Sequence, residues 1–391
     1  MSSLVVLLLL AVDPKQAESL LRKGLVELQQ NHLPGARENL EAAARLDSSN
    51  PYVWASLAQT YWKLKDKPGA LRAARSAEKF GAGNGIVAHM LTIFYTEAGD
   101  IRRAASFERA YALSAGADAE ALSRAASLSL SAGEAQEALP FAQRAVDKNP
   151  SAPNLNLLGR IQVVAGQPEN GAVNLAAAWK ADPNNQQFCF EYAQALLHRG
   201  DFQGSAAAIE QGLGVHPRSS QLQLALGVAQ YGQRRFDEAI DSFLKTIALD
   251  PSIEQPYVFL GRMLDQAGPR LAEITKRYQA WSAKQPANYL TSFLLAKASS
   301  AGGAEPIEIE KLLRRSIRLK SDFWESHFEL GLALAKQRKF PEAVAELARS
   351  AALNPQEALP HYHLARVYDR LGEAEKAAAE RELHAQLSAA Q

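Results

Sequence analysis

Several features that define common protein classes are scarce in this sequence. Its 391 residues include a single cysteine, Cys189, which excludes a small disulfide scaffold. No internal run of 18 apolar residues exists, so the sequence predicts no membrane-spanning helix after the extreme N-terminus. Forty-three basic residues balance 42 acidic ones, which gives no electrostatic reason to expect nucleic acid as a partner. A content of 47% hydrophobic residues also excludes a disordered chain.

Alanine is abundant instead, and small residues recur at a nearly constant spacing. Length alone would suggest two or three ordinary domains, but internal repeats change that estimate. One evenly spaced series is Gly24, Ala58, Thr92, Ala126, Gly159, Ala193, Gly227, Gly261, Gly331 and Ala365. A second series, twelve residues later, is Ala36, Ala70, Ala104, Ala138, Gly171, Ser205, Ala239, Ala343 and Ala377.

Each repeat predicts two short helices. Between residues 220 and 251, Leu222 and Leu226 share one helical face, the segment GQRRFDEA interrupts the pattern, and Ile240 and Phe243 resume it. Pro251 then ends the second helix. Small residues in the two series are expected where the paired helices approach closely, because large side chains would separate them.

The pattern resembles the tetratricopeptide repeat, in which helix A carries an aromatic residue or Leu, then Leu, Gly or Ala, and Tyr, and helix B carries Ala, an aromatic residue or Leu, and Pro. The best matches to helix A are Trp54, Leu57, Ala58 and Tyr61, and Tyr257, Leu260, Gly261 and Leu264. The best matches to helix B are Phe236, Ala239, Phe243 and Pro251, and Phe340, Ala343, Leu347 and Pro355. The resemblance implies an all-α fold, a right-handed superhelical α-solenoid of about eleven repeats.

We divide the chain into a hydrophobic leader, residues 1–16, and a solenoid, residues 17–391. Repeats are expected to start near residues 17, 51, 85, 119, 152, 186, 220, 254, 290, 324 and 358. The interval from Gly261 to Gly331 is slightly longer than two regular repeats need, so the segment 265–323 is expected to be irregular, with Glu273 where alanine belongs. The irregularity either kinks the solenoid or presents a binding loop, or it is drift without a function. The charged last helix is expected to cap the array.

The leader contains an apolar block, residues 4–12, which has the length of a signal-peptide core. A charged segment before it and a clear cleavage site after it are both missing. The block therefore predicts either an export signal, which would place the protein in a bacterial periplasm, or a hydrophobic N-terminal helix that caps the array in the cytoplasm. N-terminal sequencing of the mature protein separates the two, since an intact Met1 or Ser2 contradicts the signal.

Residue patterns typical of catalysis are missing. The glycine-rich segment 81–85 falls at a repeat boundary after a helix, which favours a turn over a phosphate loop. His361 and His363 would point about 200° apart on a helix, which argues against shared metal ligation. Cys189 lies at a buried position and is expected to pack as a small hydrophobe. We therefore expect no enzyme activity, no cofactor and no metal site.

Five cations lie close together at Lys311, Arg314, Arg315, Arg318 and Lys320. Acidic residues precede them, so we favour a solvated helix B face with local charge compensation over a patch for an anionic partner.

The resemblance also implies a partner surface, because the second, fifth, ninth and twelfth positions of helix A line the concave face in this family. Those positions nominate Tyr52, Gln59, Trp62, His89, Asn156, Arg160, Phe190, Gln194, Tyr231, Arg262, Asp265, Phe328, Tyr362 and Arg366. Aromatic and arginine side chains are typical of recognition hot spots. The alternative for each residue is packing between repeats or ordinary exposure to solvent.

These observations favour a non-enzymatic scaffold that binds a peptide segment or several protein partners along its concave face. The alternative is a substrate-recruiting or regulatory subunit of a separately encoded envelope enzyme or assembly machinery; a purely structural spacer has less need of aromatic inner positions. The chaperone-binding carboxylate clamp of some family members is disfavoured, because Leu21 and Leu25, and Ala55 and Gln59, occupy its positions.

Overall fold

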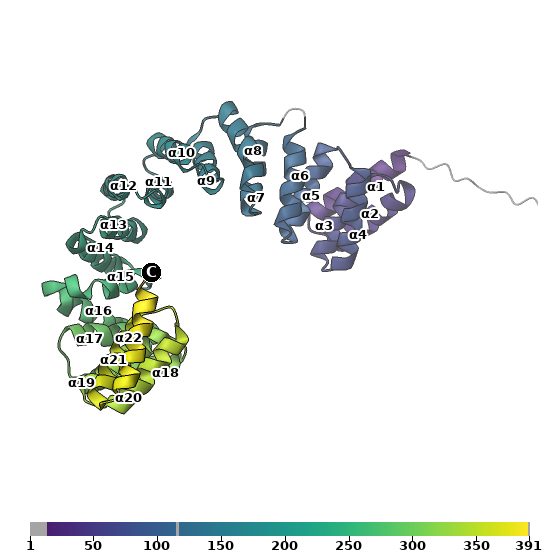
Figure 1. Cartoon of the computed structure of the whole chain (residues 1–391). Coiled ribbons are helices and arrows are strands. Elements are labelled where there is room, and N and C mark those ends of the chain that lie inside the picture. Colours follow the sequence, from purple (N-terminus) through teal and green to yellow (C-terminus); the bar gives the residue numbers. More distant parts are fainter. Residues whose placement is uncertain (1–13, 115–116, 390–391) are drawn as a thin grey trace, which may run out of the picture. The chain divides into compact units, whose positions relative to one another are not determined.

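The computed structural model describes residues 14–114 and 117–389, and these residues form helices and turns without strands (Figure 1). The apolar block of residues 4–12 lies outside the described residues. Successive helices pair, and we call the first of each pair helix A and the second helix B. Contacts divide the chain into two compact units, Met1–Ala195 and Leu196–Gln391.

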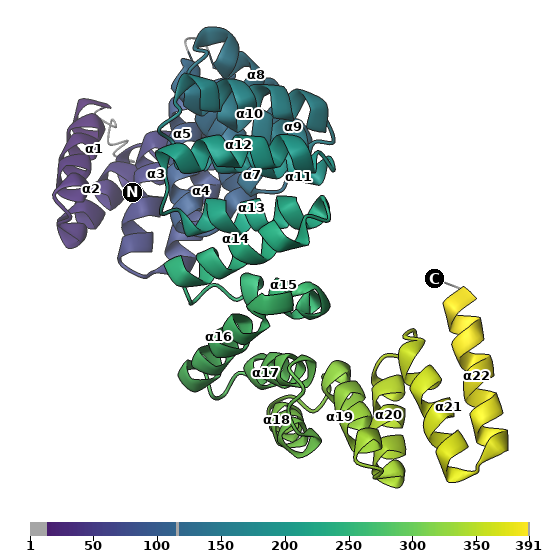
Figure 2. The ribbon, with the colours of Figure 1, turned by 90° about the vertical axis from the view of Figure 1, so that its left-hand side faces the viewer.

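The first unit contains the helices α1 Pro14–Gln29, α2 Leu33–Leu46, α3 Pro51–Lys63, α4 Lys67–Phe80, α5 Gly85–Glu97, α6 Ile101–Ala112, α7 Ala119–Ser131, α8 Ala135–Lys148, α9 Ala152–Val164 and α10 Pro168–Ala181. The next helix, α11 Gln186–His198, begins in the first unit and ends in the second. The second unit continues with α12 Phe202–Val215, α13 Ser220–Gly232, α14 Phe236–Leu249, α15 Gln255–Arg262, η1 Leu264–Gln266, η2 Gly268–Arg270, α16 Leu271–Lys284, α17 Tyr289–Ala301, α18 Pro306–Leu319, α19 Trp324–Lys336, α20 Phe340–Leu353, α21 Leu359–Leu371 and α22 Ala374–Ala389. The helix α1 therefore begins inside the expected leader. Figure 2 shows α19 beside α20 and α21 beside α22.

Polar caps start many of the helices. The side chains of Asn50, Asp66, Asn84 and Asp100 accept hydrogen bonds from free backbone N–H groups in the first turns of α3, α4, α5 and α6. The sequence thus places a helix start at nearly every expected boundary in this part of the chain.

The turn between helices A and B recurs with a residue in the left-handed backbone conformation. Glycine fills this place at Gly133 (φ 78°) and Gly166 (φ 82°), whereas Lys65, Arg234 and Arg338 adopt φ values of 60–65° there. Residues with a Cβ are strained in this conformation and glycine is not.

Exchanging glycine at this turn is therefore expected to change stability in opposite directions at two sites. Arg338→Gly should raise the free energy of unfolding by up to about 1 kcal/mol, and Gly133→Ala should lower it by about 1 kcal/mol. A Cβ at Gly133 would have no atom within 4 Å, so any loss there comes from the backbone alone. Thermal unfolding of the two variants measures both signs; a gain for Gly133→Ala would contradict the strain argument.

The two series of small residues meet inside the repeats. A Cβ on Gly331 would lie 2.6 Å from Leu347 Cγ and 3.3 Å from the backbone oxygen of Ala343, twelve residues later. A Cβ on Gly159 would lie 2.8 Å from the backbone oxygen of Gly171, again twelve residues later. Helix A and helix B therefore touch backbone to backbone at these positions, which explains why small residues occupy them.

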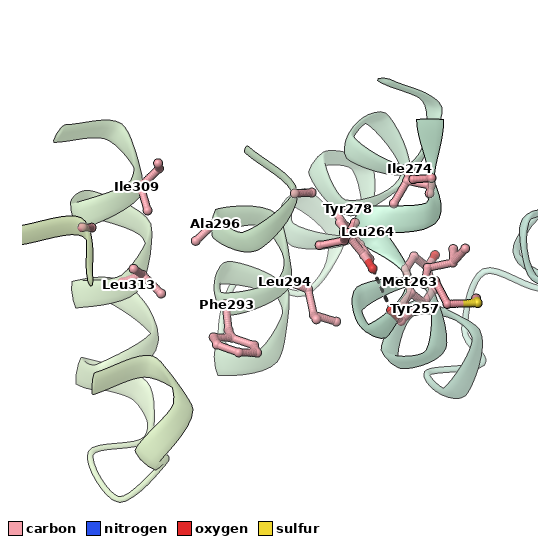
Figure 3. Packing of buried hydrophobic residues seen from close by; sticks show 14 of the residues in the cluster. Tyr257, Met263, Leu264, Ile274, Tyr278, Phe293, Leu294, Ala296, Ile309 and Leu313 are labelled. Carbon is pink, nitrogen blue, oxygen red and sulfur yellow. Dashed lines mark hydrogen bonds between the residues drawn. The ribbon is translucent and has the colours of Figure 1, made fainter. Parts of the chain in front are cut away.

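The repeat after Asp250 departs from this pattern. Helix A ends early, because α15 has 8 residues and the 3₁₀ helices η1 and η2 follow it, whereas α17 and α18 have the regular 13 and 14 residues. Figure 3 shows Tyr278 of α16 reaching Tyr257 of α15, where its hydroxyl donates a 2.7 Å hydrogen bond to the backbone oxygen. Trp281 stacks on the Tyr257 ring at 4.2 Å. Large buried side chains thus fill the space that the shortened helix leaves.

Candidate functional site

The A helices of neighbouring repeats contact one another in several places: α3 contacts α5, α7 contacts α9, and α19 contacts α21. Contacts between successive B helices are fewer. We call the surface formed by the A helices within each unit the helix A surface. The fourteen residues nominated from the sequence differ in how far they are exposed on it.

Six of them are exposed: Arg160, Gln194, Arg262, Asp265, Tyr362 and Arg366. Seven are half-buried: Tyr52, Gln59, Trp62, His89, Phe190, Tyr231 and Phe328. Asn156 is buried. Asp265 lies in η1 instead of a helix A, because α15 ends at Arg262.

The first three nominated residues contact the next repeat. The Tyr52 hydroxyl accepts a 2.8 Å hydrogen bond from Asn84 Nδ2, and Gln59 Nε2 donates to the Met90 backbone oxygen at 3.4 Å. The Trp62 ring meets the Phe94 ring edge-on, with centroids 6.0 Å apart. These side chains hold the second and third repeats together, so part of each is unavailable to a partner.

His89 belongs to a charge cluster around a buried carboxylate. Glu108 of α6 is completely buried, and it accepts hydrogen bonds from His89 Nδ1 at 3.0 Å and from Arg124 Nε at 2.9 Å. Burial alone would lower the pKa of Arg124, but the hydrogen bond to Glu108, together with the charges of Glu108 and Glu120, raises it. The cluster borders a hollow of about 390 Å³, whose other walls include Ile93 and Leu128.

Sequence reasoning missed Glu108 and Arg124. A usable signal existed for Glu108, because it lies four residues after Ala104 and four before Ala112, both buried, on the inward face of α6. A carboxylate on an otherwise alanine-lined face needs a cationic or hydrogen-bonding partner.

A second polar cluster joins α9 to α11. Asn156 Nδ2 donates a 2.5 Å hydrogen bond to Glu191 Oε2, and Gln187 Nε2 donates to Oε1 at 2.9 Å. Arg160 Nε lies 3.5 Å from Glu191 Oε1. Two nominated residues, Asn156 and Arg160, are therefore brought together by a carboxylate that the sequence did not nominate.

In the second unit, aromatic contacts hold Tyr231. Its ring packs against Phe236 and Phe259, with centroids 5.8 and 5.4 Å away. The Arg262 guanidinium lies 5.7 Å from the centre of the Phe259 ring and lines a hollow of about 350 Å³.

The last two repeats bring three more nominated residues together, Phe328, Tyr362 and Arg366. Phe328 and Tyr362 contact the ring of His363, with centroids 5.4 and 5.0 Å away, and the Arg366 guanidinium lies 5.6 Å from the centre of the Tyr362 ring. Burial, and secondly the charge of Arg366, lower the pKa of His363. Arg366 lines a pocket of about 330 Å³.

The basic cluster on α18 is compensated in part. Arg314 pairs with Glu310 and Glu342 at 2.8 and 3.2 Å, and Arg315 donates to the backbone oxygen of Pro286. Lys320 lies 4.7 Å from the centre of the Tyr289 ring. These contacts agree with the charge-compensated interpretation. Cys189 is buried, as expected.

Glu310 makes this region sensitive to acid. Burial would raise the pKa of Glu310, but hydrogen bonds from Arg314, Gln337 and Lys339 lower it to about 2. In an unfolded chain the pKa is about 4.3. A lowered pKa in the folded state means that the carboxylate stabilises the fold above about pH 4.5, and that this contribution disappears as the pH falls through 2.

We therefore expect Glu310→Gln to lower the free energy of unfolding at pH 7 by about 1–2 kcal/mol. The gap between wild type and variant should shrink below pH 4, because Glu310 then takes up a proton in the unfolded chain, whereas in the folded state it stays ionised down to about pH 2. Thermal unfolding at a series of pH values measures this difference in stability. The control is Glu308→Gln, because Glu308 lies exposed on the same helix. A gap that stays constant down to pH 2 would rule out this role of the carboxylate.

Among the described residues, no group of three His, Cys, Asp or Glu side chains is placed to hold a metal ion. In the same part of the chain, no helix is long and apolar enough to cross a membrane.

A comparison with known protein families identifies the family of this chain. The tetratricopeptide repeat matches residues 11–85, 156–211, 193–252 and 328–387, which together cover more than half of the chain. The chain belongs to the tetratricopeptide repeat family. The expected all-α fold is thereby confirmed, and the eleven helix pairs in the described part of the chain are consistent with the expected eleven repeats. Members of this family are in general protein-interaction scaffolds without enzyme activity.

Similar solved structures include Naa15/Naa10 bound to HypK-THB, at 13% identity and a TM-score of 0.48, covering 94% of this chain and 68% of that chain. The APC/C hetero-tetramer Cut9-Hcn1 matches at 13% identity and a TM-score of 0.45, covering 98% and 97%. Yeast Tom70 matches at 15% identity and a TM-score of 0.40, covering 95% and 92%. No curated protein matches the sequence.

Proposed function

We propose that this tetratricopeptide repeat protein is a non-enzymatic scaffold that binds segments of partner proteins on its helix A surface. The observation that carries the proposal is that this surface is hollowed in each unit, by about 390 Å³ beside His89 and by about 330 Å³ beside Arg366. Both hollows are large enough for side chains of a docked segment, since they fall within the range of volumes typical of ligand pockets.

The chemistry of the surface supports the same function. Ile93 is 41% exposed at the first hollow although it is a large apolar residue, and Arg160, Arg262 and Arg366 are exposed among aromatic and amide side chains. Apolar and arginine side chains together provide area and hydrogen bonds to a partner.

Cross-linking tests the proposal directly in cells that produce the protein. A photo-reactive residue is introduced at exposed helix A positions, Arg160 and Gln194, and at exposed helix B positions, Arg144 and Val173, as matched controls. We expect the same partner protein to be cross-linked from the helix A positions and not from the helix B positions. Equal cross-linking from both faces, or from helix B alone, would refute a helix A site.

Identification of the cross-linked protein also bears on the alternative role. An enzyme captured from helix A positions would make the chain a recruiting or regulatory subunit of that enzyme. Trp62 and Tyr231 are poor choices for substitution, because their rings pack against Phe94 and Phe259 and their loss would disturb the fold.

A further inference from the structure

The pocket beside Arg366 is lined by residues of α19, α20 and α21 in the second unit, and the charged side chains that line it are all basic. Lys336, Arg366 and Arg370 line it together with His363, and no carboxylate does. Its apolar lining comes from Leu332, Ala335, Phe340 and Val367. It therefore combines three permanent cations with an apolar wall.

Arg366 and Arg370 have no acidic partner in the described part of the chain, and Lys336 has only a nearby carboxylate with which it forms no ion pair. None of them forms an ion pair, although carboxylates are common nearby. Those carboxylates are engaged elsewhere: Glu346 pairs with His327, Glu380 with His361, and Asp369 with Arg381.

One half-buried carboxylate, that of Glu329, does lie close to Lys336. Glu329 and Lys336 line a small neighbouring cavity of about 40 Å³. Burial raises the pKa of Glu329, although Lys297 and Lys336 act in the opposite direction. Glu329 is thus a counter-charge for Lys336, but it does not line the pocket that contains Arg366 and Arg370.

We propose that this pocket binds an acidic segment of a partner protein, in which glutamate or aspartate side chains alternate with apolar ones. Two guanidinium groups can each hold a carboxylate through paired hydrogen bonds, and the Lys336 ammonium adds a third positive charge. The apolar neighbours of the acidic residues then contact Phe340 and Leu332. This inference rests on the proposed scaffold function and adds the chemistry of one partner segment.

Fluorescence anisotropy with the full-length protein tests it. The probe is a fluorescein-labelled peptide of three Glu-Glu-Leu-Ala units, and the comparison peptide has glutamine in place of each glutamate. We expect the glutamate peptide to bind more tightly, and its affinity to fall as salt is added. Arg366→Glu with Arg370→Glu should weaken binding by about tenfold or more.

Arg349→Glu is the matched control, because Arg349 is exposed on α20 outside the pocket. It should leave the affinity within about twofold. The double variant Arg366→Lys with Arg370→Lys keeps both positive charges but removes the paired hydrogen bonds, so we expect a loss of affinity smaller than that from charge reversal. This variant keeps the test valid if charge reversal unfolds the repeat.

Three outcomes would overturn the proposal: equal binding of both peptides, equal loss from the Arg349 control, or a phosphoserine version of the peptide that binds far more tightly than the glutamate version. The last would make the pocket a phosphate site. If the glutamate peptide fails to bind while cross-linking from Arg160 persists, the acidic-segment inference fails and the scaffold proposal stands.

Discussion

Arg124→Ala is expected to lower the free energy of unfolding by about 2–3 kcal/mol, at or just below the lower end of the range for breaking a fully buried ion pair, because the Arg124 side chain is 37% exposed. The substitution leaves the carboxylate of Glu108 completely buried with His89 as its remaining partner. A buried carboxylate without a permanent cation must either remain charged at a high cost or take up a proton. Hydrogen exchange of α5–α7, together with thermal unfolding of the whole chain, measures the loss.

A second substitution separates this mechanism from simple loss of packing. Adding Glu108→Gln to Arg124→Ala should recover part of the stability, because the unpaired buried charge is then gone. Glu120→Ala is the control: Glu120 also pairs with Arg124, but its side chain is 79% exposed, so we expect a loss of at most about 0.5 kcal/mol. A double variant less stable than Arg124→Ala alone would disprove the charge argument.

Gly159→Ala should destabilise the fifth repeat by about 2 kcal/mol, the size typical of overpacking. The added Cβ would lie 2.7 Å from Leu175 Cγ, 2.8 Å from the Gly171 backbone oxygen and 3.0 Å from the Leu175 backbone nitrogen. Two of these three atoms belong to the backbone, so α9 and α10 would have to separate.

Gly214→Ala is the matched change in an open place. A Cβ there would meet no atom within 4 Å, and Gly214 lies inside the helix α12 without a positive φ. Because alanine is the better helix former, we expect a gain of up to about 1 kcal/mol. Urea unfolding of both variants measures the two changes in the free energy of unfolding. A stability gain for Gly159→Ala would show that the helices can separate at little cost.

The partner surface was predictable only in outline. Register placed Arg366 and His89 at helix A positions, and both line hollows in the structure. The repeat register could not show that Asn156 is buried against Glu191, nor that Asp265 lies in a 3₁₀ helix. Whether the fourteen nominated residues contact a partner stays a prediction.

The sequence by itself determined the repeat, because contacts within a repeat join residues at constant offsets. Gly331 meets Leu347 just as Gly159 meets Leu175, sixteen residues later in each case, so the period of the chain records the packing. The tertiary structure alone decided how neighbouring repeats share side chains. The Glu108 cluster takes Arg124 from the next repeat, and the basic pocket takes Lys336 from one repeat and Arg366 and Arg370 from another. Such groupings depend on how each helix pair turns against the next, and no single repeat's pattern encodes that rotation.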